Sequence, residues 1–198
     1  MTARPRDRLI AGAIDLIRRK GVAGTGMTEL VERSRTARRS IYQNFPGGKQ
    51  ELVEEAARTA GKVVTEAISA VDDREGSLAR LGAFMQMWRD ILVASDFQAG
   101  CPVVAAALGG AEVPTAPAIA AETFADWQRE ITVQLEAEGL DPATAEATAT
   151  LGIAAIEGGV VLAIASRSLL PLDQVTDQLG VLLTHQLARS VNTRSGAT

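Results

Sequence analysis

Apolar residues recur every three or four positions along most of the chain, which is the spacing of one face of an α-helix. In residues 6–20 this face consists of Leu9, Ile10, Ala13, Ile14 and Ile17. Proline, paired glycines and paired acids interrupt the pattern at intervals, and such residues end helices. The pattern predicts helices over residues 6–20, 27–34, 37–44, 49–70, 75–95, a short one between Gly100 and Gly109, and further helices over 114–138, 142–166 and 170–191.

These nine helices, with no convincing strand, predict an all-α fold. The strongest start signal is Asp141-Pro142, because aspartate favours the N-cap and proline the first helical position. We expect three regions: a head over residues 1–48, a body over 49–191 and a disordered tail over 192–198. The longest charge-free run, residues 97–111, is shorter than the roughly 18 residues of a membrane span. No membrane partner is therefore expected.

Charge divides the chain unevenly between its two ends. Residues 1–50 hold eleven Lys/Arg and four acids, a net charge of +7, whereas the remaining 148 residues hold nine and twenty, a net charge of −11. A basic head on an acidic body is typical of a protein whose head binds a polyanion. One cysteine and one histidine leave no material for a zinc site, and no cofactor is expected. The single cysteine and the lack of a secretory signal favour the cytoplasm.

The head combines a helix–turn–helix pattern with two short motifs. The second and third helices meet at a short turn, Ser40-Ile41-Tyr42 precedes Phe45 by three positions, and Phe45-Pro46-Gly47-Gly48-Lys49 leads into the fourth helix. These residues resemble the DNA-binding domain of the TetR family of bacterial transcriptional repressors. The Phe-Pro-Gly-Gly-Lys form and Gly100-Cys101-Pro102-Val103 are similar to the branch that contains drug- and antibiotic-responsive repressors. The resemblance implies a nine-helix architecture with a sensing and dimerising body.

Side chains of the third helix suit a DNA major groove. Ile41 and Phe45, four residues apart, can anchor the helix to the core of the head. Arginine suits guanine and glutamine suits adenine. The resemblance implies that the recognition surface is Arg38, Arg39, Ser40 and Gln43. By resemblance, the residues that contact the DNA backbone are Thr28, Tyr42 and Lys49. A merely solvated basic face is the alternative.

The turn departs from the family pattern, which usually has Gly-Val-Ser where this chain has Arg35-Thr36-Ala37. Glycine tolerates a left-handed backbone at that point, and arginine costs roughly 1 kcal/mol more. Either the turn differs from that of the family, or Thr36 caps the third helix in place of the missing serine. The turn sets the angle of the third helix, and the operator sequence that the helix recognises depends on that angle.

The body carries aromatic and methionine side chains at helical spacing, which suit an adaptable apolar cavity. With the family resemblance, the expected ligand-binding residues are Phe84, Met85, Trp88, Phe97, Cys101, Phe124, Trp127, Gln128, Ile131 and Glu157. Ordinary core packing is the alternative for the stripes. Glu157 could equally face solvent, and Cys101 is expected to be inert, with redox sensing as the alternative.

A lane of small residues on the eighth helix and a leucine-rich stripe on the ninth suit helix pairing. The resemblance implies that these helices form a four-helix dimer interface. The expected interface residues are Gly152, Ala155, Gly159, Ala163, Val175, Leu179, Leu182 and Leu183. Internal core is again the rival explanation, and His185 is expected to be structural or at the surface.

Three functions follow from these observations. The leading hypothesis is a homodimeric repressor on a palindromic operator of double-stranded DNA, released by a small apolar effector. The second is a small helical enzyme acting on an apolar substrate, for which Cys101 and His185 are the one available pair. The third is a DNA-binding dimer that has no effector.

Overall fold

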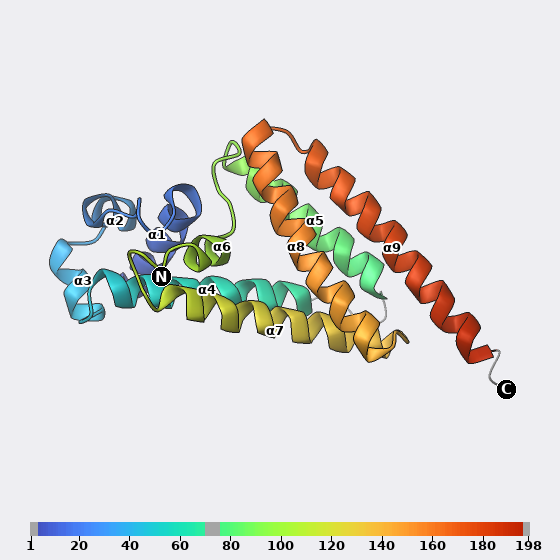
Figure 1. The fold of residues 1–198 in the computed structure, drawn as a ribbon. Coiled ribbons are helices and arrows are strands. Elements are labelled where there is room, and N and C mark those ends of the chain that lie inside the picture. The colour runs from blue at the N-terminus through green and yellow to red at the C-terminus, as the bar shows by residue number, and fades with distance from the viewer. Residues whose placement is uncertain (1–3, 70–75, 196–198) are drawn as a thin grey trace. The chain divides into compact units, whose positions relative to one another are not determined.

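The computed structural model describes residues 4–69 and 76–195, and over these residues the chain is all-α, as predicted (Figure 1). The described helices are α1 (Pro5–Lys20), α2 (Met27–Ser34), α3 (Arg38–Asn44), α4 (Lys49–Ser69), α5 (Gly76–Ala94), α6 (Pro102–Ala107), α7 (Ala116–Ala137), α8 (Pro142–Ser166) and α9 (Leu170–Ser195). Most predicted bounds lie within one or two residues of these, because proline, glycine and capping residues set them locally.

The C-terminal end of the chain differs from the prediction. Helix α9 continues to Ser195 and does not end near Val191, so a disordered tail from residue 192 is wrong for residues 192–195. No proline or glycine interrupts the chain between Pro171 and Ser195 except Gly180, so nothing local forces an earlier end. Residues 196–198 of the expected tail lie outside the described residues, as does the break expected at Asp72-Asp73.

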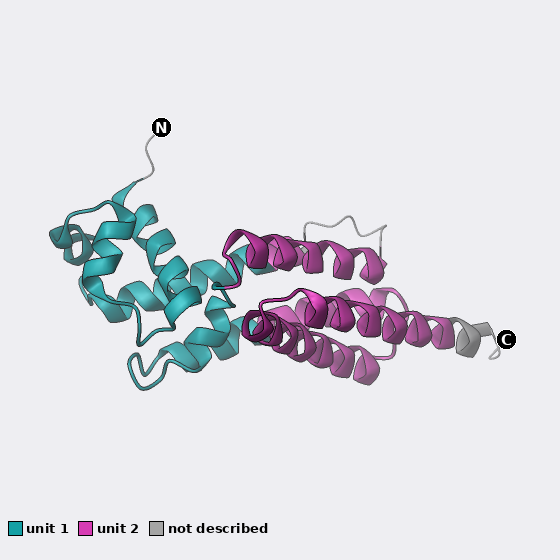
Figure 2. Ribbon diagram, turned by 90° about the horizontal axis from the view of Figure 1, so that it is seen from above, with its two compact units in different colours: residues 1–64, 98–124 teal, residues 65–97, 125–198 magenta. Residues whose placement is uncertain are grey.

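The chain forms two compact units, shown in teal and magenta in Figure 2. Unit 1 comprises residues 1–64 and 98–124, and unit 2 comprises residues 65–97 and 125–198. Helices α4 and α7 each contribute to both units. The division therefore falls inside α4 and not at residue 49, since Leu52, Val53 and Ala56 of α4 are buried in the core of unit 1.

Unit 1 is built around the apolar face of α1. Leu9, Leu16 and Ile17 are fully buried there. Gly12 lets α2 approach closely, because a Cβ at this position would lie 3.4 Å from the Leu30 Cδ1 atom. At the end of α1, Arg18 donates from Nε to the Gly100 carbonyl at 3.0 Å, and the Gly100 amide donates to the Arg18 carbonyl at 2.9 Å. These bonds fix the start of α6 against α1.

Unit 2 contains α5, α8 and α9 packed side by side (Figure 1). Asp141 is the N-cap of α8, and its carboxylate accepts the Thr144 amide at 3.1 Å. At the other end Arg167 adopts a left-handed conformation and pairs with Asp96 at 2.6 Å. Leu135, Leu140, Ala145 and Leu183 form one buried cluster of this unit.

By length and composition alone, helix α8 is long and apolar enough to cross a membrane. Of the 18-residue apolar stretch that meets this criterion, 28% is buried inside the protein. One such helix is weak evidence for a membrane, because helices of soluble proteins meet the same criterion. Its exposed apolar residues lie at helical spacing along one side: Leu151, Ala154, Gly158, Val161, Leu162 and Ala165. This side of α8 is available for contact with another surface.

Candidate nucleic-acid interface and ligand pocket

Helix α3 separates its anchoring side chains from its polar ones. Ile41 and Phe45 are completely buried, which confirms their predicted role as anchors. Arg38, Arg39 and Gln43 are exposed, while Ser40 is half-buried. The polar side chains predicted to form the recognition surface therefore lie on the solvent side of a short helix that is held rigidly by its apolar side.

The turn before α3 keeps a left-handed residue although it lacks glycine. Arg35 has φ 50° and ψ 46°, and its amide donates to the Glu32 and Val31 carbonyls. The Thr36 amide also donates to the Val31 carbonyl, at 3.2 Å. These bonds end α2 in the same way as a glycine-based C-cap does. Arg35 thus keeps the left-handed backbone that glycine tolerates at this position.

The alternative in which Thr36 caps α3 is wrong. The N-cap of α3 is Ala37, which has no side-chain oxygen to accept an amide. The Thr36 hydroxyl instead lies 2.8 Å from the Ser34 hydroxyl. Ser34 is buried, and its carbonyl accepts the Arg8 guanidinium at 3.2 Å. Thr36 thus joins a polar contact between α1 and α2, and α3 starts without a side-chain cap.

Two of the predicted backbone-contacting residues flank the corner between α3 and α4. Tyr42 lies against Gly48, the residue before Lys49, since a Cβ at Gly48 would lie 3.5 Å from the Tyr42 Cε1 atom. Tyr42 is 52% exposed and Lys49 begins α4, where backbone amides favour an anion. Thr28 is exposed in the first turn of α2.

Many of the basic side chains in the head are engaged within the protein. The bonds are Arg6–Glu55 at 2.9 Å, Arg19–Asp15 at 3.0 Å, Lys20–Glu29 at 2.7 Å and Arg33–Asp15. Among the residues that the structure describes, no ion pair involves Arg38, Arg39 or Lys49. Three cationic groups on α3 and at the start of α4 are therefore available to a polyanion.

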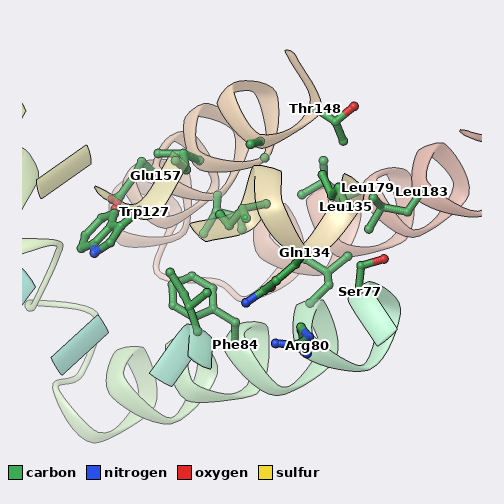
Figure 3. Close-up of a pocket in the computed structure, with 17 residues that line it drawn as sticks. Ser77, Arg80, Phe84, Trp127, Gln134, Leu135, Thr148, Glu157, Leu179 and Leu183 are labelled. Atoms are coloured by element: carbon green, nitrogen blue, oxygen red, sulfur yellow. The ribbon is translucent and has the colours of Figure 1, made fainter. Parts of the chain in front are cut away.

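Unit 2 contains a cavity of about 110 Å³ (Figure 3). Four of the predicted ligand-binding residues line it: Phe84, Trp127, Ile131 and Glu157. The Trp127 indole donates to the Thr65 hydroxyl at 3.1 Å, and Ile68 also lines the cavity. The cavity walls thus come from α4, α5, α7, α8 and α9.

The other predicted ligand-binding residues do not line this cavity. Met85 and Trp88 are buried in the core and do not belong to the lining. Gln128 donates to the Thr150 hydroxyl at 2.9 Å, outside the lining. Phe97 follows α5, and two further residues, Cys101 and Phe124, belong to unit 1. The aromatic stripes therefore divide between core and cavity.

Sequence reasoning missed four of the polar residues that line the cavity. They are Ser77, Arg80, Gln134 and Thr148. Ser77, Arg80, Leu81 and Phe84 share one face of α5 at three- and four-residue spacing. The available signal was Arg80 on the same face as Leu81 and Phe84.

Half of the residues predicted for the dimer interface are buried within the chain. Gly159, Ala163, Leu179 and Leu183 are buried, and a Cβ at Gly159 would lie 3.2 Å from the Val175 Cγ2 atom of α9. Gly152, Leu179 and Leu183 line the cavity. Ala155, Val175 and Leu182 are half-buried. The four buried positions follow the internal-core alternative, and the exposed side of α8 is a different set of residues.

Comparison with known proteins defines the class of protein, a helix–turn–helix regulator of transcription. The description "Bacterial regulatory proteins, tetR family" matches residues 9–56, and "Transcriptional regulator LmrA/YxaF-like, C-terminal domain" matches residues 77–178. The uncharacterized HTH-type transcriptional regulator Rv0196 of Mycobacterium tuberculosis is 34% identical over 92% of this chain and 96% of its own. The HTH-type transcriptional regulator LmrA of Bacillus subtilis is 25% identical over 90% and 96%.

Solved structures share the fold. A regulatory protein TetR from Rhodobacter sphaeroides has a TM-score of 0.79 at 21% identity and covers 90% of this chain and 98% of its own. A TetR transcriptional regulator from Legionella pneumophila has a TM-score of 0.78 at 19% identity over 90% and 96%. The chain therefore belongs to the TetR family of bacterial regulatory proteins, which bind DNA and are regulators of transcription, not enzymes.

Proposed function

We propose that the protein is a homodimeric repressor that binds a palindromic operator in the cytoplasm and leaves it when an effector enters the cavity of unit 2. The observation that carries this proposal is the concentration of Arg38, Arg39 and Lys49, without ion pairs among the described residues, at one corner of the head.

In the proposed complex α3 lies in the major groove. Arg38, Arg39, Ser40 and Gln43 reach base edges, while Thr28, Tyr42 and Lys49 hold phosphates. The buried Ile41 and Phe45 support this assignment, since a recognition helix must be fixed before it can discriminate between bases.

A second copy of the chain supplies the symmetry that a palindrome requires. We place the interface on the exposed side of α8, together with Ala155 and Leu182 from the predicted set. Val161 and Leu162 support this position, because they are more than half exposed in the single chain. An apolar helix side of this length is costly in water and is covered when two copies pair.

The cavity is suited to control DNA binding through α4. Ile68 of α4 lines it, and Thr65 of α4 accepts the Trp127 indole. Lys49 opens the same helix at its other end. A ligand shifts the equilibrium between two states of α4 only if its affinity for them differs, so the proposal requires preferential binding to the state that does not fit the operator.

The DNA assignment is tested by a salt titration of operator binding with Arg38→Ala and Lys49→Ala. Each variant loses one phosphate or base contact, so affinity falls and, for Lys49→Ala, the salt slope decreases by about one unit. Arg129→Ala is the matched control, because Arg129 is exposed on α7 and pairs with Asp126 at 2.8 Å. Wild-type affinity and salt slope in both head variants refute the assigned contacts.

The effector assignment is tested separately by thermal-shift screening of small apolar compounds, followed by operator release. A compound that binds only the native state raises its unfolding temperature. The proposal expects at least one such compound to release the operator and to lose its effect when Phe84→Ala widens the cavity. Compounds that stabilise the protein without changing operator affinity contradict ligand control.

A further inference from the structure

Arg35, in the turn between α2 and α3, is one of four non-glycine residues with a positive φ in the described part of the chain. The others are Asp96, Phe97 and Arg167. This backbone conformation is strained for a residue that has a Cβ atom, whereas glycine adopts it freely. Strained residues persist where the surrounding structure holds them, and they are frequent at functional sites. The role of the Arg35 side chain is therefore of interest.

The second arginine of this group has a role inside its own unit. The Arg167 guanidinium donates to the Asp96 carboxylate at 2.6 Å and to the Asp96 carbonyl at 3.2 Å. Arg167 is the C-cap of α8, and Asp96 follows the end of α5. The side chain of this left-handed arginine therefore ties two segments of unit 2 together.

The Arg35 side chain has no such role within the described residues. It is exposed, and its guanidinium forms no ion pair or hydrogen bond there. The turn itself is closed by backbone groups, since the amides of Arg35 and Thr36 donate to carbonyls of α2. The fold thus uses the backbone of residue 35 and leaves its charged side chain to a partner outside the chain.

The position of Arg35 favours a nucleic acid as that partner. Arg35 ends α2, and the exposed residues Arg38 and Arg39 begin α3 three positions later. In helix–turn–helix complexes the first helix crosses the DNA backbone, while the N-terminal residues of the second contact base edges. The turn joins these two parts, so an exposed cation in it lies near the phosphates that flank the groove.

We propose that Arg35 binds a phosphate group of the DNA duplex, in addition to the phosphate contacts proposed for Thr28, Tyr42 and Lys49. This inference rests on the proposed placement of α3 in the major groove. A guanidinium donates two parallel hydrogen bonds to phosphate oxygens, and such charge-assisted bonds are strong. A phosphate contact carries no sequence information, so Arg35 strengthens binding to any duplex and fixes the position of the head on it.

The experiment measures binding of the full-length protein by fluorescence anisotropy between about 50 and 200 mM KCl. The probes are two labelled duplexes of about 30 base pairs, roughly three helical turns. The wild-type protein selects one from random sequence, and the other is a scrambled version of it. The test variant is Arg35→Asn, because asparagine tolerates a left-handed backbone and carries no charge.

We expect Arg35→Asn to reduce the salt slope by about 0.9 per bound copy of the chain. Its loss of affinity should therefore be about three- to fourfold larger per copy at the low-salt end of this range than at the high-salt end. Both duplexes should lose affinity by a similar factor, as a phosphate contact requires. Arg35→Lys should keep most of the slope, because an ammonium group also binds phosphate.

Arg33→Gln is the matched control. Arg33 lies two residues earlier on α2, and its guanidinium pairs with Asp15. The substitution removes the same charge from the head without removing an unpaired cation, so the salt slope should stay close to that of the wild-type protein. Arg35→Gly is a second neutral variant that keeps the left-handed turn. Circular dichroism at the binding temperature establishes that each variant is folded.

The outcomes separate this inference from the proposed function. Wild-type affinity and slope in Arg35→Asn and Arg35→Gly, with weaker binding by Lys49→Ala, overturn the inference and leave the proposed DNA interface intact. Wild-type behaviour of all three variants contradicts both. A loss confined to the selected duplex, with an unchanged slope, also overturns the phosphate contact, because it indicates an effect on base recognition. Equal losses in Arg35→Lys and Arg35→Asn overturn it as well, since lysine retains the charge.

Discussion

Arg35 occupies a backbone conformation that glycine adopts far more easily. Its φ of 50° and ψ of 46° lie in the left-handed region, and its amide closes the end of α2. The conformation is imposed by the need to reverse the chain between α2 and α3, and the buried side chains Leu30 and Ile41 on either side hold it. The strain of this residue is therefore balanced by packing at some distance from it.

Replacing Arg35 with glycine tests whether its left-handed backbone costs stability. Arg35→Gly is expected to raise the free energy of unfolding by about 1 kcal/mol, because the left-handed conformation loses its steric penalty. Urea denaturation measures the change. The matched control is Glu32→Gly in the helical part of α2, which is expected to lower stability by about 1 kcal/mol. An unchanged or lower stability of Arg35→Gly means that the arginine side chain itself stabilises the turn.

Residue identity predicts much of the head but only part of the cavity. The anchoring role of Ile41 and Phe45 follows from their spacing on a short helix, and both are buried. On α5 the stripe of large side chains covers more than one face, so spacing alone could not separate Phe84, which lines the cavity, from Met85, which is in the core. That choice depends on where α7 and α8 pack, and only the folded structure provides it.

At the scale of the element, local sequence signals set where α8 begins, and tertiary packing determines which side of the helix is buried. Asp141 and Pro142 determine its start, as the sequence predicted. The lane of small residues on α8 predicts close approach of another helix, and at Gly159 that helix is α9 of the same chain, through Val175. Sequence spacing identifies a packing surface without identifying which helix covers it, because a helix of the same chain and one of a second copy have the same requirements.

The N-cap of α8 predicts a pH dependence of stability. Hydrogen bonds from Thr144 lower the pKa of the Asp141 carboxyl in the folded protein. The cap therefore stabilises the fold above the ordinary pKa of aspartate, and this contribution is lost as pH falls through the lowered value. Asp141→Ala is expected to lower the unfolding temperature at pH 7 by a few degrees and to have less effect near pH 3.

Asp141→Asn is the control for this cap. Asparagine caps helices about as well as aspartate but carries no titrating carboxyl. The variant should keep most of the stability at pH 7 and lose less of it on acidification than the wild-type protein does. Thermal unfolding followed by circular dichroism between pH 3 and pH 7 measures both variants. Parallel pH profiles for all three proteins would contradict a charged cap.

At the scale of the whole molecule, the uneven charge of the chain agrees with a basic head in a family of DNA-binding regulators. The sequence also predicted the all-α fold, because helix starts and stops are encoded locally. It could not locate the exposed side of α8. That side contains alanine, glycine, valine and leucine just as the buried side does, and only burial within the folded chain tells the two apart.

The exposed side of α8 yields the last prediction. Leu162 is 58% exposed in the single chain, so a partner copy would bury it near the centre of the proposed interface. Leu162→Asp places a charge there, and its desolvation is expected to raise the dimer dissociation constant by about 100-fold or more. Sedimentation equilibrium measures this constant. Operator affinity should fall in parallel, because a monomer contacts one half-site.

Leu108→Asp is the matched control for surface polarity, since Leu108 is 83% exposed and follows α6 in unit 1. It should leave both the dissociation constant and the operator affinity unchanged. A wild-type dissociation constant for Leu162→Asp would place the interface elsewhere. A monomeric Leu162→Asp that still bound the full operator with wild-type affinity would contradict the requirement for two copies, because one head can occupy only one half of a palindrome.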